Sequence, residues 1–330
     1  MKIPIANLAA IAVIALGSSA ATAQSPSPKP AFALPQESIT ITAVKPSEET
    51  IRSFVETRAT PTRFLGRAAR WRRPICPLTV GLGDKFAKYV TQRIRDVASA
   101  VGAPVSTDPG CKPNIEVVFT TAPQAFMDGV RKTGPVFLGY YDNQSQADEM
   151  AKVTHPIQAW YTTESLDYDG SAQVDSGQCH GSGTVLNLFY VSPGAADMGG
   201  AVTPITLNLS CARVMHSNGS RLGSGYDSGF ENVLILAEPA KLFDYEVGSL
   251  ADYITMLALS QPASLDKCQE LPSISNLLAK GCASASSKIT DGDLAYLQGL
   301  YNAPNGYALT GQRDQMQYQM KKTLVTDKSH

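Results

Sequence analysis

The sequence predicts an α+β fold, in which a mixed sheet has an amphipathic helix before it and two helices after it. Three observations predict this class. Residues 76–121 read as strand, helix and strand; residues 136–238 contain short apolar runs separated by turn-forming residues; and residues 241–303 return to helical spacing. The 330-residue chain is 43% hydrophobic and 17% charged, with a formal net charge of −1, so it can bury a sizeable core and nucleic acid is not expected as a partner.

The first 23 residues have the three-part pattern of a secretory signal. Lys2 precedes an apolar stretch that ends near Leu16, and the small residues Ala21-Thr22-Ala23 follow, so cleavage is expected after Ala23. The alternative is a membrane anchor, but the apolar run is shorter than the ~20 residues that a span needs. We therefore expect an exported protein, periplasmic or secreted, with no transmembrane segment in its mature chain.

The next residues predict a tether, a domain and a tail. Residues 24–38 are rich in proline, which interrupts helices and central strands, so they predict an extended tether. A single α+β domain is expected over residues 39–305, with a short strand near 37–44, and residues 306–330 are expected to be a polar, frayed tail. Residues 46–58 predict a helix capped by Ser47, with Ile51, Phe54, Val55 and Arg58 on one face.

Residues 58–73 have an unusual composition, with six arginines and Trp71. We interpret this segment as exposed, with its arginines either solvated or paired with Glu48, Glu49 and Glu56. The functional alternative is an anion-binding surface for a component of the cell envelope or an acidic protein partner. The candidate residues for that role are Arg63, Arg67, Arg70, Arg72 and Arg73.

A βαβ unit is predicted between residues 76 and 121. Residues 76–82 and 114–121 read as strands, and residues 84–102 predict a helix that Asp84 caps and Gly102 ends. Its apolar stripe consists of Phe86, Val90, Ile94, Val97 and Val101. Further strands are predicted from the apolar runs at 136–141, 157–163, 183–191, 205–215 and 232–238.

Six cysteines, an even number in an exported chain, predict three disulfides. Sequence alone allows 15 pairings, and we expect the sequential one: Cys76–Cys111, Cys179–Cys211 and Cys268–Cys282. A zinc site is the alternative, but the chain has no Cys-x-x-Cys pair.

Two helices are predicted after the sheet. In residues 241–262, Phe243, Val247, Leu250, Ile254 and Leu257 define a buried stripe beside a polar shoulder. Residues 289–303 predict a shorter helix, capped by Thr290 or Asp291, with Leu294, Leu297 and Leu300 facing inward.

These last two helices resemble parts of zincin metallopeptidases. "YEVGS", residues 245–249, is similar to the His-Glu-x-Gly-His start of a zincin helix and keeps Glu246 and Gly248. "ITDGDLAYLQGLY", residues 289–301, resembles the helix that closes many metzincin-type domains. The resemblance implies a degenerate zincin-like domain of the kind found in uncharacterised exported bacterial families, with a zincin-like helix and a closing helix after the sheet. The alternative is an unrelated α+β domain.

Departures from the zincin motif bear on the chemistry. Catalytic zinc needs three protein ligands, two of them histidines one helical turn apart. Tyr245 and Ser249 stand at those two positions, Thr255 stands at the third, and no methionine follows that could make a Met-turn between Gln261 and Asp293. Without a metal, Glu246 has no activated water to deprotonate. The degenerate site candidates are Tyr245, Glu246 and Ser249, and no metal or other cofactor is expected.

Other candidate chemistry is sparse. The histidines His155, His180, His216 and His330 form no His-x-x-x-His pair, although the first three could converge in space. Cys179 lies in a "GQCHG" segment that superficially matches a nucleophile elbow but lacks its strand-to-helix context. We expect a non-catalytic binding or envelope-associated protein. The alternative is a secreted or periplasmic hydrolase, metallopeptidase-like, with unconventional ligands.

Overall fold

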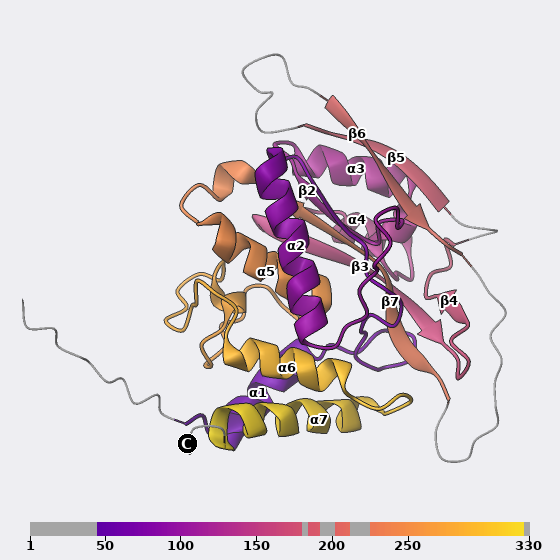
Figure 1. Cartoon of the computed structure of the whole chain (residues 1–330). Coiled ribbons are helices and arrows are strands. Elements are labelled where there is room, and N and C mark those ends of the chain that lie inside the picture. The colour runs from indigo at the N-terminus through magenta and orange to yellow at the C-terminus, as the bar shows by residue number, and fades with distance from the viewer. Residues whose placement is uncertain (1–44, 180–183, 192–201, 212–224, 327–330) are drawn as a thin grey trace, which may run out of the picture. The chain divides into compact units, whose positions relative to one another are not determined.

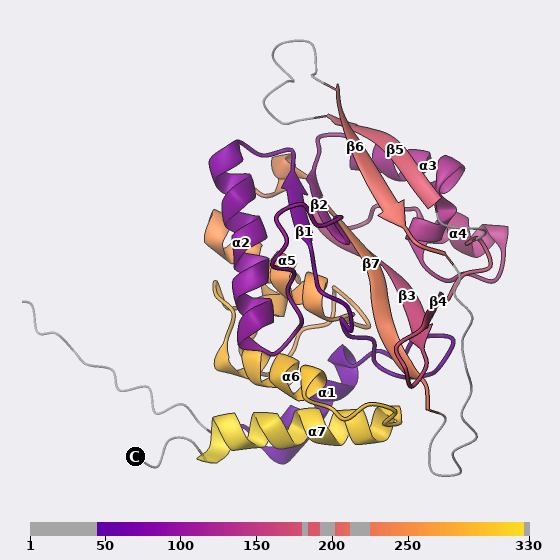
Figure 2. The ribbon, with the colours of Figure 1, turned by 45° about the vertical axis from the view of Figure 1, so that its right-hand side comes forward.

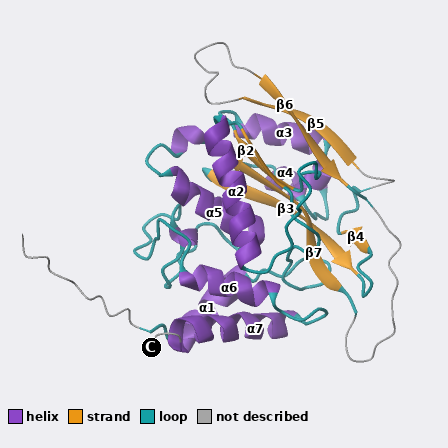
Figure 3. Cartoon of the chain, viewed as in Figure 1, coloured by secondary structure: helices purple, strands orange, loops and turns teal. Residues whose placement is uncertain are grey.

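Five strands form a mixed sheet, and Figures 1 and 3 show how the helices are arranged around it. In sheet order they are β1 (Pro77–Val80), β2 (Ile115–Phe119), β7 (Asp227–Ala237), β3 (Ile157–Leu166) and β4 (Ala172–Val174). β1, β2 and β7 run parallel, whereas β3 is antiparallel to both β7 and β4. The predicted α+β class is therefore confirmed.

This computed structural model describes residues 45–179, 184–191, 202–211 and 225–326. The predicted signal (1–23), the tether (24–38) and the strand near 37–44 lie outside these ranges. So do His180, His216 and His330.

The predicted βαβ unit is present. Helix α2 (Asp84–Ala100) joins β1 to β2 and contacts helix α5 (Val247–Leu259). Gly102, just beyond the end of α2, has φ +85°, the left-handed conformation that glycine adopts without strain. Two details of the prediction were wrong: the N-cap is Gly83 rather than Asp84, and the Phe86 side chain is 48% exposed because the first turn of α2 extends past the core.

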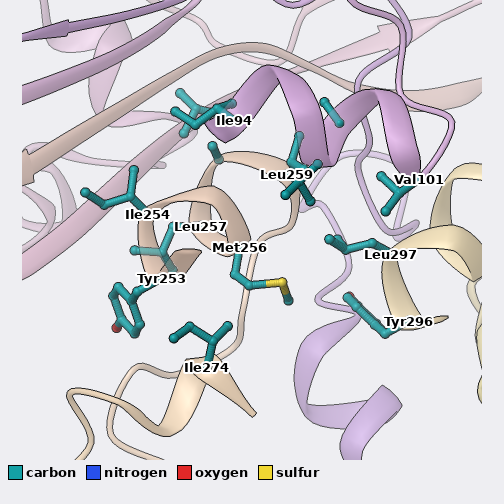
Figure 4. Packing of buried hydrophobic residues seen from close by; sticks show 14 of the residues in the cluster. Ile94, Val101, Tyr253, Ile254, Met256, Leu257, Leu259, Ile274, Tyr296 and Leu297 are labelled. Atoms are coloured by element: carbon teal, nitrogen blue, oxygen red, sulfur yellow. The ribbon is translucent and has the colours of Figure 1, made fainter. Parts of the chain in front are cut away.

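One face of the sheet is covered by α2 and α5, and three further helices share their apolar core. These are α1 (Glu48–Arg58), α6 (Asp291–Tyr301) and α7 (Leu309–Lys321). Their buried side chains form one continuous apolar cluster, part of which is shown in Figure 4. The predicted caps of α1 and α6 are confirmed: Ser47 Oγ accepts from Thr50 N at 3.0 Å, and Thr290 with Asp293 forms a reciprocal capping box.

Helix α7 corrects the expected frayed tail. Met316 and Met320 are fully buried against the α1–α6 side of the core. Gln312 pairs with the backbone of Ala68, accepting from its N–H at 2.8 Å and donating to its carbonyl at 3.2 Å. Residues 309–321 are therefore part of the folded domain.

The opposite face carries α3 (Pro123–Thr133), α4 (Gln144–Met150), a 3₁₀ turn and a hairpin (Figure 2). The hairpin strands, β5 (Thr184–Val191) and β6 (Val202–Leu209), pair antiparallel, and Leu186 and Leu188 face inward as their alternation predicts. The strand predicted at 136–141 was wrong: residues Pro135–Leu138 form the 3₁₀ turn, in which Phe137 and Leu138 are buried.

The remaining short elements lie around the C-terminal helices. They are 3₁₀ turns at Pro239–Lys241 and Ile274–Asn276, and a π-helical turn at Lys322–Thr326.

All three sequential disulfides are formed. Cys76 bonds to Cys111, Cys179 to Cys211 and Cys268 to Cys282, which leaves no free thiol. Among the described residues, no helix combines the length and apolar character needed to cross a bilayer.

Candidate binding groove between α2 and α5

The three degenerate site candidates, Tyr245, Glu246 and Ser249, lie at the start of α5, but only Ser249 is within the helix. α5 begins at Val247, and Glu246 is its exposed N-cap, whose carbonyl accepts from Leu250 N at 3.1 Å. Tyr245 precedes the helix, where its N–H donates to Leu242 O at 3.1 Å. Ser249 lies in the first turn and is only 5% exposed. Tyr245 and Ser249 are therefore not separated by one helical turn.

The polar residues further along α5 have structural partners. Thr255 donates to the carbonyl of Ala251 at 2.7 Å and is completely buried. Asp252 accepts from Arg93 Nε and from Ile289 N, which ties α5 to α2 and to the segment before α6. Phe243, predicted to begin the buried stripe, is instead 84% exposed and precedes the helix, so that part of the prediction was wrong.

A groove of about 910 Å³ lies beside the start of α5. Its walls come from β1, the first half of α2, and Val247 and Gly248 of α5. α2 and α5 lie side by side in both ribbon views (Figures 1 and 2). The groove therefore lies next to Tyr245, Glu246 and Ser249 in the chain, although none of these three side chains lines it.

Aromatic side chains give the groove its apolar character. Phe86 and Tyr89 line it and are 48% and 49% exposed. A methyl group at Gly248 would lie 3.5 Å from the Tyr89 hydroxyl, so this side chain reaches from α2 across to α5. Because large aromatic side chains are normally covered, two half-exposed rings in one groove are typical of a binding surface.

The turn from β1 into α2 places the groove at the carboxyl edge of the parallel strands. Gly81 has φ +86°, and a methyl group there would lie 1.9 Å from the carbonyl oxygen of Phe119 on β2, so only glycine fits. α2 follows β1 on one face of the sheet, whereas α3 follows β2 on the other. Ligands of α/β sheets commonly bind where connections diverge in this way.

The arginine-rich segment is largely buried, so its predicted exposure was wrong. Arg70 is 1% exposed; it donates to Asp227, to the carbonyls of Leu300 and Ala303, and to Asn305. Trp71 is also buried and donates to Ala258 O of α5 at 2.7 Å. The segment thus packs between the sheet and the helices.

The arginines pair with carboxylates other than the predicted glutamates. Arg72 Nε lies 3.6 Å from the Asp227 carboxylate, Arg73 pairs with Glu164 and Glu231, and the more exposed Arg63 pairs with Asp142. Arg67 is buried. The candidate anion-binding arginines are therefore spread over several partners and do not converge on one exposed surface.

A second, polar region lies under the hairpin. Arg73 and Glu231 line a 420 Å³ pocket there. Nearby on the same sheet, burial raises the pKa of Glu116 to about 8, although a hydrogen bond from Asn232 at 2.8 Å opposes this shift. Each of these two buried carboxyl groups thus has a partner within the protein: Arg73 for Glu231 and Asn232 for Glu116.

The remaining candidates have ordinary roles. His155 Nε2 lies 3.1 Å from Asp266 on the surface, and Cys179 is held in a disulfide, which argues against a nucleophile. Within the described ranges, no group of three His, Cys, Asp or Glu side chains could hold a metal ion.

Sequence reasoning missed the groove because it assigned Phe86 to the core. The available signal was the three-residue spacing of Lys85 and Lys88, and of Phe86 and Tyr89, which puts cations and aromatic rings together on the first turns of α2. Comparison with protein-family models, with curated proteins and with solved structures found no match.

Proposed function

We propose that this chain is an exported, disulfide-braced binding protein that takes up an apolar ligand in the groove between α2 and α5. The observation that carries the proposal is the pair of half-exposed rings, Phe86 and Tyr89, in a groove of about 910 Å³. Pockets that bind small ligands have volumes of about 300–1,000 Å³ and mostly apolar walls.

Export is supported by two features. Three disulfides are typical of an oxidising compartment, and the first 23 residues have the composition of a cleavable signal. N-terminal sequencing of the periplasmic or secreted form should therefore begin at Gln24.

A non-catalytic role on a degenerate zincin-like fold is part of the same proposal. Tyr245 and Glu246 lie before the first residue of α5, so Tyr245 and Ser249 are not one helical turn apart. This supports the view that α5 does not bind zinc. Purified protein that contains one zinc ion per chain and cleaves an unstructured substrate, with cleavage abolished by Glu246→Gln, would instead support the hydrolase alternative.

The binding role is tested with a neutral, environment-sensitive naphthylamine probe. We expect saturable fluorescence enhancement with the full mature chain, and about three- to tenfold weaker binding for Phe86→Ala, because the ligand covers the exposed half of a ring whose full burial contributes about 1.5–3 kcal/mol. Phe189→Ala is the control, since Phe189 is also exposed (61%, against 48% for Phe86) but lies on β5. Absence of saturable binding, or the same loss in both variants, would contradict the proposal.

A further inference from the structure

The groove has two lysines beside its aromatic rings. Lys85 and Lys88 line it, and both side chains are exposed. Among the described residues neither ammonium group has an ion-pair partner, in contrast to Lys152 and Lys241, which pair with glutamates. With Asp84 as the third charged residue of the lining, the groove carries a net charge of +1.

Three uncharged polar side chains of the groove wall already have hydrogen-bond partners within the protein. Thr91 donates to Thr79 at 2.9 Å, and Gln92 donates to Asp96 at 2.7 Å. These groups therefore do not require a polar partner from a ligand. A ligand therefore meets an apolar wall, formed by Leu78, Phe86 and Val247, together with two ammonium groups, the Asp84 carboxylate and the Tyr89 hydroxyl.

This arrangement fits a molecule that is apolar over most of its length and anionic at one end. We propose that the groove binds a single-chain anionic amphiphile, with its acyl chain along Leu78, Phe86 and Val247 and its carboxylate beside Lys85 and Lys88. The inference rests on the proposed function and names its ligand class. It commits to a monomeric amphiphile rather than to a membrane surface.

The test compares three ligands of equal chain length below their aggregation concentrations: dodecanoate, dodecan-1-ol and dodecyltrimethylammonium. Titration calorimetry with the full mature chain should give dodecanoate the highest affinity, about five- to tenfold above the alcohol, with the cation weakest. Exposed charge pairs contribute modestly, so two lysines account for a preference of this size. The preference should shrink as the salt concentration rises.

The lysines are tested directly by the double variant Lys85→Gln/Lys88→Gln. Only Asp84 then remains charged in the lining, so the variant should bind dodecanoate no better than dodecanol, and its affinity for the uncharged dodecanol should change little. The matched control is Lys132→Gln/Lys288→Gln, which removes two exposed lysines outside the groove and should keep the preference.

A steric pair tests the location. Gly248→Ala adds one methyl group to the groove wall, in ordinary contact with Tyr89, and should weaken binding of all three ligands slightly, whereas Gly248→Leu places a branched side chain there and should abolish it. Circular dichroism and the melting temperature establish that both variants fold.

The outcomes separate the two proposals. Equal affinity for dodecanoate and dodecanol in the wild type would overturn the anionic ligand but leave an apolar binding groove intact. No binding of any of the three would overturn both. Binding to phosphatidylglycerol vesicles, without binding of monomeric dodecanoate, would replace the amphiphile with a membrane surface.

Discussion

Arg70 shows how a charged side chain is accommodated almost entirely within the protein. Its guanidinium donates to one carboxylate, two carbonyls and one side-chain amide, so it joins the start of β7 to the end of α6. Arg58 is also buried and lies over the Phe54 ring, and burial lowers the pKa of both arginines, but of the two only Arg70 has an ion-pair partner among the described residues. A buried charge without a close ion pair is costly, so the two arginines differ in their contribution to stability.

These residues also show what composition could not predict. Six arginines within 16 residues favour a solvated segment, because arginine is rarely buried unless it is paired. The pairing partners, Asp227, Glu164 and Glu231, lie more than 90 residues further along the chain. Only the folded arrangement brings them to Arg70, Arg72 and Arg73.

Glu116 should make stability depend on pH. Its folded pKa is about 8, against an ordinary value of 4.5, so folding takes up a proton between these pH values. This contribution is fully present below about pH 4.5 and is lost as pH rises through about 8, at up to ~1.4 kcal/mol per pH unit. Glu116→Gln cannot ionise, so its free energy of unfolding relative to wild type should increase from pH 5 to pH 8, measured by urea denaturation.

The control for this prediction is Glu56→Gln, because Glu56 is exposed on α1. Its difference from wild type should not change over the same range. The raised pKa of Asp175 affects wild type and both variants alike, so it cancels in the difference. Parallel stability curves for Glu116→Gln and wild type would contradict the assignment.

Among the secondary-structure elements, the sequence predicted the helices that have a clear apolar spacing or a recognisable cap. α1, α2, α5 and α6 each have apolar residues at helical spacing or a recognisable cap, and their approximate positions were found. Residues 136–141 were mistaken for a strand because a short apolar run has no period of its own. α7 was missed because only Met316 and Met320 of its apolar residues are buried, and its other anchor, Gln312, is polar. The groove was missed for a related reason. Phe86 belongs to the apolar stripe of α2, but unlike the other residues of that stripe it lies beyond the core and is not buried.

The crossing of α6 and α7 depends on Gly299. A methyl group there would lie 2.4 Å from Met316 Cα, which is backbone and can move only with α7. Gly299→Ala should therefore destabilise the protein by about 1–3 kcal/mol, the usual cost of overpacking. The measurement is the free energy of unfolding in urea.

Gly292 in the same helix is the matched control. A methyl group at Gly292 would meet Thr290 Oγ1 at 3.5 Å, an ordinary contact. Gly292→Ala should leave stability unchanged or raise it by up to ~1 kcal/mol, because alanine loses less conformational entropy in a helix. Equal destabilisation by the two substitutions would show that α7 does not approach Gly299 closely.

At the scale of the whole molecule, the three disulfides stabilise three separate regions. Cys76–Cys111 links the start of β1 to the connection before β2, Cys179–Cys211 joins the two sides of the hairpin, and Cys268–Cys282 closes the loop between α5 and α6. Their sequence separations are 35, 32 and 14 residues. In the chain-entropy account, a longer loop gives a larger stabilisation.

Replacing each cysteine pair by alanine should therefore destabilise the protein unequally. The Cys76→Ala/Cys111→Ala variant should lose about 3–4 kcal/mol, and the Cys268→Ala/Cys282→Ala variant should lose roughly 1 kcal/mol less. Denaturation in urea without reductant gives both values, and wild type in dithiothreitol should be less stable than either variant. A larger loss for the shorter loop would contradict the chain-entropy ranking.

Contact between α1 and α7 has a consequence for biogenesis. Arg313 of α7 donates to the carbonyl of Ala59, just after α1, and Lys321 of α7 pairs with Glu48, the first residue of α1. Synthesis makes α1 more than 250 residues before α7. The nascent chain therefore cannot complete this side of its core until translation has passed residue 321, so a chain cut short before α7 leaves the α1 side of the core uncovered.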